Sequence, residues 1–263
     1  MDWLFEGNVL VALAVCAAAA MSTVLGSVFV VFAKEPSPRL LAFGLAFAGG
    51  AMVYVSLVEI FWKADQAFAE LHDARTAYTY ATLAFFAGVL MLALIDRLIP
   101  NPHGVMTSAN GDQAQIKRVG LLAAFAITAH NLPEGLATFL ATLDNPAVGV
   151  SLAAAIAIHN IPEGVSIAIP VFYATGSRTK AVLATVLSAL AEPAGALIGY
   201  AILAPFLSPT VFAVVFGMIA GAMVFLALDE LLPTAKRYAV GHETVYGIVT
   251  GMAALAVSLI LFR

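Results

Sequence analysis

The chain has 263 residues, of which 62% are hydrophobic and only 11% are charged. Soluble domains carry about 25% charged residues, so this composition excludes an ordinary water-soluble enzyme or binding module. The formal net charge is −4, and no basic cluster is longer than Lys117-Arg118, which argues against a nucleic-acid-binding protein. The single cysteine, Cys16, excludes an intramolecular disulfide and a metal site built from several cysteines. We expect it to be a small core residue.

Eight apolar stretches divide the chain, each long enough to cross a hydrocarbon layer about 30 Å thick. The first begins after Asp2 and Glu6 with no preceding Lys or Arg, so we read it as a membrane span and not as a secretory signal. The polar connections are too short for a separate soluble domain, and the longest runs over 100–115. The sequence therefore predicts an all-α integral membrane protein with eight transmembrane helices, 1–263 forming one polytopic domain. The predicted spans are 9–33, 39–62, 77–99, 117–142, 146–173, 179–204, 209–232 and 243–262.

Lysine and arginine residues are distributed unequally between the two sets of connections. Cytoplasmic loops carry an excess of these residues. If the N-terminus lies outside, nine of them fall on the cytoplasmic side and three outside. We therefore predict cytoplasmic odd-numbered connections and both termini outside. The cytoplasmic set is Lys34, Arg39, Arg97, Lys117, Arg118, Arg178, Lys180, Lys236 and Arg237, and the external set is Lys63, Arg75 and Arg263.

Small residues recur at helical spacing in the last three spans. Gly195/Gly199, Gly217/Gly221 and Gly247/Gly251 form Gly-x-x-x-Gly pairs, which let helix backbones approach closely. We expect ordinary packing within the chain, and a dimer seam or a sliding surface is the alternative.

Acidic residues lie inside the predicted spans, where each charge costs about 2.5–3.5 kcal/mol at the bilayer centre. Glu134, Glu163 and Glu192 lie deep in their spans, and no Lys or Arg lies at a comparable depth. Buried carboxylates without a basic partner must be protonated, hydrated or neutralised by a bound cation. The spans therefore predict a pathway for cations.

Two near-identical motifs occur in neighbouring spans. Residues 127–135 read Ile-Thr-Ala-His-Asn-Leu-Pro-Glu-Gly, and residues 156–164 read Ile-Ala-Ile-His-Asn-Ile-Pro-Glu-Gly. The copies are 29 residues apart, which is one helix plus a short turn, so adjacent antiparallel helices carry matching motifs at mid-span. Repeats that meet at the membrane midplane are typical of transporters.

The spacing inside each motif suits metal chelation. His130 and Glu134 are four residues apart, so about one turn, 5.4 Å, separates them on one helix face. His159 and Glu163 repeat this arrangement. Two such helices facing each other offer two imidazole nitrogens and two carboxylates, a mixed set suited to Zn, Fe, Co or Mn.

Other motif residues extend this interpretation. Pro133 and Pro162 each free a backbone carbonyl and predict a kink beside a polar cavity. Asn131 and Asn160 can supply amide oxygens, so a second metal would depend on the motif glutamates and on Glu192 in the sixth span.

The paired motifs resemble those of the ZIP (Zrt/Irt-like) divalent metal transporters, most closely the bacterial ZupT-type members. The resemblance covers the full length, including eight spans, outside termini, a longer third connection and the motif pair in the fourth and fifth helices. It implies kinked fourth and fifth helices that form a central metal site between flanking helix bundles. The implied ligands are His130, Asn131, Glu134, His159, Asn160, Glu163 and Glu192.

The resemblance also implies a function. It indicates a secondary transporter of the bacterial inner membrane that moves Zn²⁺, and also Fe²⁺, Mn²⁺ or Co²⁺, into the cytoplasm by elevator-like alternating access. The metal is the transported substrate, and no separate cofactor is expected. Candidate pathway residues are Met52, Ser56, Glu59, Asp96, Asp229 and Glu230. Two features depart from the family pattern: some relatives have an acid where Asn160 stands, and the third connection offers only His103.

Two other functions remain as alternatives. An intramembrane metalloenzyme would use a His-Glu-x-x-His or Glu-x-x-His helix, and these motifs read His-x-x-x-Glu. A proton-conducting pathway could use the same carboxylates and histidines without metal, although their close spacing favours a chelate. No Gly-x-x-x-x-Gly-Lys motif is present, so direct ATP drive is not expected. A homodimer is our expectation for the assembly.

Overall fold

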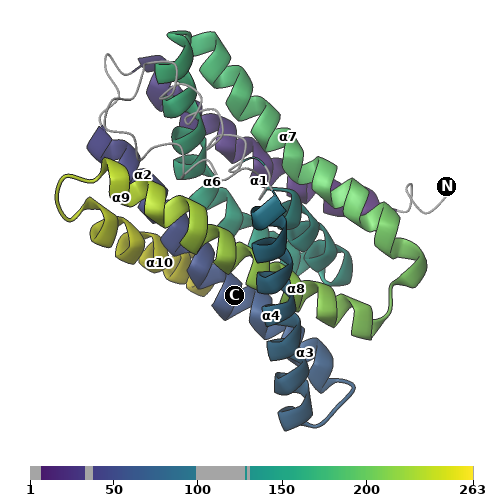
Figure 1. The fold of residues 1–263 in the computed structure, drawn as a ribbon. Helices are drawn as coiled ribbons and strands as arrows, with labels where there is room; N and C mark the ends of the chain where they lie inside the picture. Colours follow the sequence, from purple (N-terminus) through teal and green to yellow (C-terminus); the bar gives the residue numbers. More distant parts are fainter. Residues whose placement is uncertain (1–6, 33–37, 99–127, 129–130, 263) are drawn as a thin grey trace.

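The computed structural model describes residues 7–32, 38–98, 128 and 131–262, and this part of the chain contains helices and no strand (Figure 1). Residues 131–144 form a helix that carries the Asn131–Gly135 part of the first motif. The named helices are α1 (Gly7–Phe32), α2 (Pro38–Val55), α3 (Phe61–Ala69), α4 (Ala74–Leu98), α6 (Pro146–Thr175), α7 (Arg178–Leu203), α8 (Pro209–Leu226), α9 (Leu232–Tyr238) and α10 (Glu243–Phe262).

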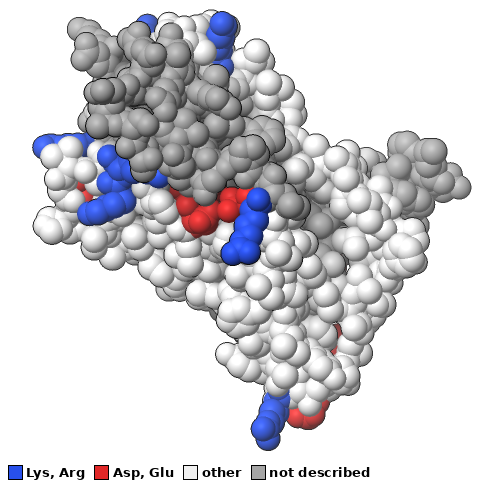
Figure 2. Space-filling view, in the orientation of Figure 1, with Lys and Arg blue, Asp and Glu red and all other residues white. Residues whose placement is uncertain are grey.

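Seven helical segments of the described chain are long and apolar enough to cross a membrane. The predicted fourth span, 117–142, lies partly outside the described residues, and so does the connection over 100–115. Charged side chains are sparse in the space-filling view, and uncharged residues cover most of it (Figure 2). The all-α fold predicted from the sequence is confirmed.

The second and seventh spans are longer than predicted. They run over Pro38–Ala69 and Pro209–Tyr238, because short polar helices continue each apolar segment. Lys63, which we assigned to an external connection, therefore lies within α3 and is buried. The assignment to a connection was wrong because the helix continues past Lys63, with Ala64 and Phe68 buried and Phe61 packed against the core.

A single π-helical turn interrupts each of these two long spans. η2 covers Ser56–Ile60 between α2 and α3, and η5 covers Ala227–Leu231 between α8 and α9. Such turns insert one residue into a helix and occur often at functional sites. Here η2 contains Glu59 and η5 contains Asp229 and Glu230, so both interruptions coincide with the acidic residues of the predicted pathway.

The helices form two groups. We call α1, the helix over 131–144, α6 and α7 the motif bundle, because it contains both motifs. The flanking bundle consists of α2 with η2 and α3, α4, α8 with η5 and α9, and α10. In the motif bundle α1 packs against α6 and α7, and in the flanking bundle α2 packs against α10 while α4 packs against α8 (Figure 1). Contacts of α6 with α2 and α10 join the bundles.

Glycines bring backbones together inside the motif bundle. A Cβ on Gly164 would overlap the carbonyl of Thr23 in α1, and one on Gly135 would overlap the carbonyl of Glu192 in α7. The partner helices reciprocate, since a Cβ on Gly195 would overlap the carbonyl of Leu132. The final glycine of each motif is thus the point at which a motif helix touches its neighbour backbone to backbone.

The three Gly-x-x-x-Gly pairs all pack within the chain, as we expected. Gly195 and Gly199 face the helix over 131–144. Gly217 and Gly221 face α4, and Gly247 and Gly251 face α2. Of the glycines that the structure describes, Gly44 alone has its nearest neighbour in the other bundle, where its Cβ position lies 3.8 Å from the Pro162 carbonyl oxygen. The tightest glycine contacts therefore lie within the bundles, whereas α6 packs against α2 and α10 of the flanking bundle without such a contact.

Side-chain caps define several helix ends. Asn145 accepts hydrogen bonds from the amides of Ala147 and Val148 and begins α6, and Gly176, with a φ of 67°, ends it. Asp73 precedes α4 and accepts a 2.7 Å hydrogen bond from the Thr76 hydroxyl, which lowers the pKa of this exposed carboxyl.

The glycine contacts predict how each bundle tolerates a methyl group. Gly164→Ala forces a Cβ into the backbone of α1, and overpacking of this kind costs about 1–3 kcal/mol. We expect a clearly lower thermal unfolding temperature in detergent. Gly44→Ala is the matched control, since its Cβ has ordinary van der Waals space. Equal unfolding temperatures for both variants would contradict this account of the packing.

Candidate metal centre

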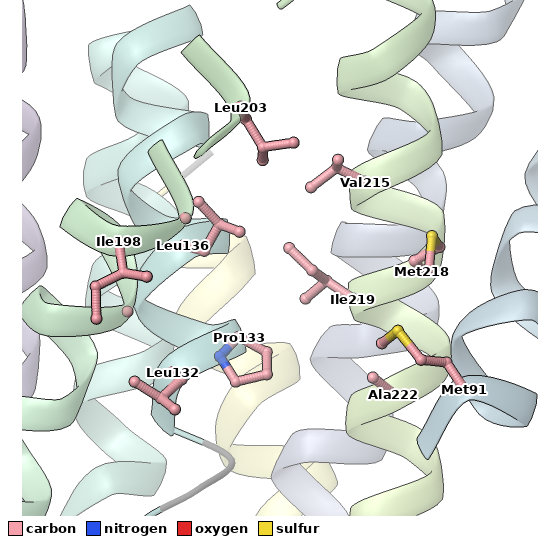
Figure 3. A pocket seen from close by; sticks show the side chains of 12 residues that line it. Met91, Leu132, Pro133, Leu136, Ile198, Leu203, Val215, Met218, Ile219 and Ala222 are labelled. Atoms are coloured by element: carbon pink, nitrogen blue, oxygen red, sulfur yellow. The ribbon is translucent and has the colours of Figure 1, made fainter. Parts of the chain in front are cut away.

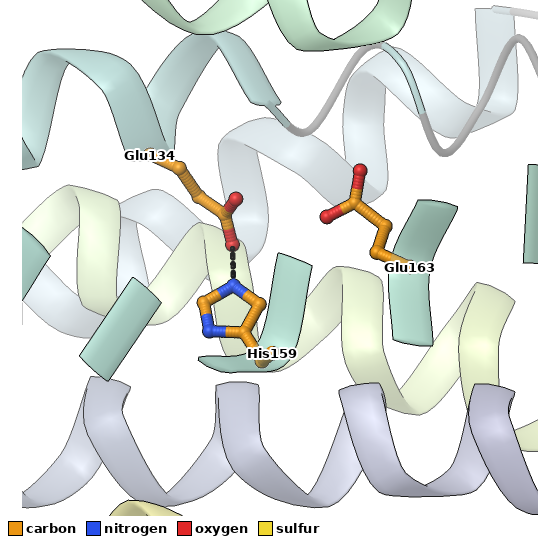
Figure 4. Close-up of side chains that lie close together, drawn as sticks. All are labelled: Glu134, His159 and Glu163. Atoms are coloured by element: carbon orange, nitrogen blue, oxygen red, sulfur yellow. Dashed lines mark hydrogen bonds and ion pairs between the residues drawn. The ribbon is translucent and has the colours of Figure 1, made fainter. Parts of the chain in front are cut away.

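Three metal-ligating side chains from the two motifs converge inside the motif bundle (Figure 4). Glu134 comes from the helix over 131–144, and His159 and Glu163 come from α6. The His159 Nε2 atom lies 3.0 Å from the Glu134 Oε1 atom, and one ligand atom from each residue lies within 4.8 Å of the others. All three residues are at most 1% exposed.

The local structure explains this convergence. His159 and Glu163 lie one turn apart on α6, which continues as one helix through Pro162 and Pro170. Figure 4 shows the Glu163 carboxylate on the same side of α6 as the His159 ring, with Glu134 reaching the ring from the other helix. The fourth residue of the predicted set, His130, lies outside the described residues.

The asparagines connect this cluster to neighbouring helices. The Asn160 amide donates to the Glu192 carboxylate at 2.6 Å and to the Ala19 carbonyl at 3.3 Å. The Asn131 amide donates to the carbonyl and the hydroxyl of Ser188, each at 3.2 Å. Both amide groups make these hydrogen bonds through their N–H donors, and these contacts do not involve their oxygen atoms.

Buried oxygen atoms remain available around the three side chains. Asn131 Oδ1, Asn160 Oδ1 and Glu192 Oε2 are buried, and no hydrogen-bond partner for them lies among the described residues. Buried acceptors are rarely left unsatisfied, so these atoms favour a ligand that accepts electron pairs. A metal cation is such a ligand.

The charge of the site points the same way. Glu134, Glu163 and Glu192 are all buried, and among the residues that the structure describes Lys63 is the one buried lysine or arginine. Lys63 pairs with Asp144, at the far end of the helix over 131–144. An ionised carboxylate costs several kcal/mol to bury without compensation, so a divalent cation would offset a large unfavourable term here.

The first helix contributes to this site, and we missed that from the sequence. The Ala19 carbonyl contacts Asn160, and the Cys16 thiol donates to the Gly135 carbonyl with a sulfur–oxygen distance of 3.6 Å. Cys16 is buried, as predicted for a small core residue. The polar pair Ser22-Thr23 in an otherwise apolar span was the available signal. Ser188 carried no signal beyond being polar.

The predicted pathway residues fall into two separate places. Met52, Ser56 and Glu59 are all buried along α2 and η2, and Glu59 is not part of the Glu134–His159–Glu163 cluster. Asp96 from α4 joins Asp229 and Glu230 from η5 in a second group, whose carboxylate oxygens lie within 4.8 Å of one another. The structure thus brings three of the pathway acids together, away from the buried cluster.

The ligand set can hold a borderline divalent cation. Zinc binds imidazole nitrogen and carboxylate oxygen in a tetrahedral or slightly expanded shell, and one imidazole with two carboxylates matches that preference. The motif order His-x-x-x-Glu places no glutamate as a general base between two histidine ligands, unlike hydrolytic zinc helices. Binding and release are therefore the chemistry that these residues support.

Comparison with known proteins agrees with this geometry. The chain matches the ZIP Zinc transporter family over residues 102–259. It is 64% identical to "Zinc transporter ZupT" of Neisseria meningitidis serogroup B, over 97% of both chains. It is 62% identical to the protein of the same name from Xanthomonas axonopodis pv. citri, over 97% of this chain and 96% of the relative. It is 46% identical to the protein of the same name from Nitratidesulfovibrio vulgaris, over 98% of this chain and 99% of the relative. The chain is therefore a multi-pass membrane protein that belongs to the ZIP zinc transporter family.

Proposed function

We propose that this protein is a secondary transporter that carries Zn²⁺ across the membrane into the cytoplasm. The observation that carries the proposal is the buried cluster of Glu134, His159 and Glu163, in which one imidazole and two carboxylates lie within ligand distance of one another. Family membership and the names of the relatives support zinc as the substrate.

The site's composition supports a carrier with some breadth among divalent metals. Its donors are nitrogen and oxygen, and the Cys16 thiol, which donates to the Gly135 carbonyl, is not one of the grouped ligand atoms. Such donors bind Zn²⁺, Fe²⁺, Mn²⁺ and Co²⁺, and they disfavour Cu⁺, which prefers sulfur. Zinc is the main substrate in this proposal, and the other three are secondary.

The predicted orientation places one acidic group on the cytoplasmic side of the buried cluster. Nine of the twelve Lys and Arg residues lie on the side that the charge rule places in the cytoplasm. The Asp96–Asp229–Glu230 group lies on that side in the same scheme, near Arg97 and Lys236. We propose that this group receives the metal as it leaves the buried cluster toward the cytoplasm of a bacterial cell.

The packing of the two bundles supports an elevator-like movement. Backbone contacts through glycine lock helices together within each bundle, whereas Gly44 meets the other bundle at an ordinary van der Waals distance. Two rigid groups with a smoother seam between them are suited to sliding. The motif bundle, which holds the buried cluster, is the part that would move against the flanking bundle.

An apolar cavity of about 350 Å³ lies along this seam (Figure 3). Leu132, Pro133 and Leu136 line it from the motif bundle, together with residues of α7, and α4 and α8 supply the opposite wall. Pro133 is adjacent to Glu134, so the seam runs beside the metal-ligating helix. An incompletely packed apolar wall costs less to shear than interdigitated side chains, which favours movement there.

The proposed function makes a prediction about metal flux. In liposomes with a trapped zinc indicator, we expect saturable Zn²⁺ entry that requires no nucleotide, and its loss in Glu134→Ala and in Glu163→Ala. Each change removes a carboxylate ligand from a site with few donors, and losing such a ligand costs at least the 10–100-fold known for outer-shell partners.

The matched control is Asp73→Asn, which removes an exposed carboxylate at a helix cap far from the buried cluster. Its flux should equal that of the parent protein. Unchanged flux in both glutamate variants, with all proteins correctly folded, would overturn the proposal.

A further prediction concerns movement of the bundles. Cysteines replacing Leu136 and Ile219 face the cavity from opposite bundles (Figure 3). A short reducible bis-thiol reagent that joins them should stop zinc flux, and a reducing agent should restore it. The control pair replaces Leu136 and Gly199, which contact each other inside the motif bundle.

Both pairs are made in a Cys16→Ala background whose flux is first shown to match the parent. Cross-linking within the motif bundle should leave flux largely intact. Full flux in the protein cross-linked between the bundles would exclude an elevator-like movement along this seam.

A further inference from the structure

Lys63 occupies an unusual environment near one end of the bundles. It lies in α3 and is only 8% exposed. Its ammonium nitrogen is 3.6 Å from the Asp144 Oδ2 atom and lies 5.6 Å and 6.0 Å from the ring centroids of Phe216 and Phe212. One ion pair and two aromatic rings of α8 therefore hold a buried positive charge.

The ion pair joins the two bundles. Lys63 and both phenylalanines belong to the flanking bundle, and Asp144 is the last residue of the helix over 131–144 in the motif bundle. A cavity of about 420 Å³ lies beside the pair, and both bundles line it. Trp62 and Gln66 come from α3, and Val148 comes from the first turn of α6.

Asp144 must move together with the buried Glu134–His159–Glu163 cluster. It lies ten residues after Glu134 on one continuous helix, which places the two about 15 Å apart along the helix axis. Asn145 then caps α6, which carries His159 and Glu163. Any displacement of the motif bundle along the seam therefore changes the distance between Asp144 and Lys63.

The two residues of the Lys63–Asp144 ion pair differ in their exposure to solvent, which favours the pair and still allows it to open. Lys63 is desolvated, so leaving its charge without a partner is unfavourable. The Asp144 side chain is 53% exposed, so water can replace its half of the pair. The aromatic rings and the neighbouring cavity offer the ammonium a partner and room for water when Asp144 leaves.

We propose that Lys63 and Asp144 form a latch that keeps this end of the seam closed and must open when the motif bundle moves. The predicted orientation places this end outside the cell, so the latch would close the outer mouth while the cluster faces inward. The inference rests on the proposed transport function, and it assigns to two residues outside the metal cluster a control over its access.

A second ion pair provides a matched comparison. Arg39 of α2 and Glu243 of α10 lie 3.5 Å apart, and both belong to the flanking bundle. This pair does not cross the seam, so a movement between the bundles leaves it intact. Breaking it should alter neither access to the cavity nor the transport cycle.

The test measures access to the cavity directly. Val148→Cys, in the Cys16→Ala background, places a thiol in the cavity wall. We expect Lys63→Met and Asp144→Asn each to raise the rate of its modification by a membrane-impermeant maleimide by roughly fivefold.

The double variant should show no further rise, because either change alone opens the latch. Lys63→Arg keeps the positive charge and should restore the slow rate, and Arg39→Met should leave that rate unchanged.

The outcomes separate the latch from the transport function, because labelling needs no metal flux. Faster labelling in Lys63→Met and Asp144→Asn supports the latch even if no zinc enters liposomes, in which case the transport proposal fails. Zinc flux in the parent protein with unchanged labelling in both variants overturns the latch and leaves transport standing. If Lys63→Met does not fold, Asp144→Asn decides alone, since Asp144 is half exposed. An equal rise in Arg39→Met would also overturn the latch, because it would reflect general loosening.

Discussion

Three glutamate carboxylates, Glu134, Glu163 and Glu192, are buried within a few helices of an apolar bundle, and much of the structure is arranged around that burial. Each carboxylate would cost several kcal/mol to bury if it stayed ionised and uncompensated. His159 and Asn160 contact two of them, and amide and carboxylate oxygens remain nearby. In the function that we propose, a divalent cation would offset this cost, and the same buried negative charge would favour cations over anions.

Holding these residues in place requires a rigid bundle, and the elevator-like transport that we propose requires that the bundle can be displaced. The motif glycines meet the first need, because Gly135 and Gly164 let the metal-ligating helices contact α7 and α1 backbone to backbone. The seam between the bundles suits the second requirement, displacement. Both bundles line an apolar cavity there, and the Lys63–Asp144 ion pair connects them. The elevator-like movement that we propose would use both features: glycine contacts that hold each bundle together, and a seam that contains an apolar cavity.

Much of the fold, and the meeting of residues from the two motifs at one site, could be predicted from the sequence. Apolar length alone identified the spans, because a helix that crosses the bilayer must bury its backbone polar groups in itself. The four-residue spacing in the second motif correctly placed His159 and Glu163 on one face of α6, and the same prediction for the first motif falls on His130, outside the described residues. Copies 29 residues apart indicated neighbouring helices, and Glu134 does meet His159.

Other features left little trace in the sequence. The π-helical turns at Ser56–Ile60 and Ala227–Leu231 insert one residue without changing hydrophobicity, so periodicity over short windows does not reveal them. The Asn160 contact with Ala19 uses a backbone carbonyl, which every residue has. Lys63 was placed in a loop because its span was predicted to end too early, and its partner Asp144 is 81 residues away in the chain.

The central claim is that Glu134, His159 and Glu163 together bind the transported metal, and anomalous diffraction at the zinc absorption edge from zinc-loaded crystals tests it most directly. Our account predicts a zinc peak about 2.0–2.2 Å from the His159 imidazole nitrogen and from a carboxylate oxygen of each glutamate. Zinc bound only at the Asp96–Asp229–Glu230 group, with the buried cluster free of metal, would contradict the account.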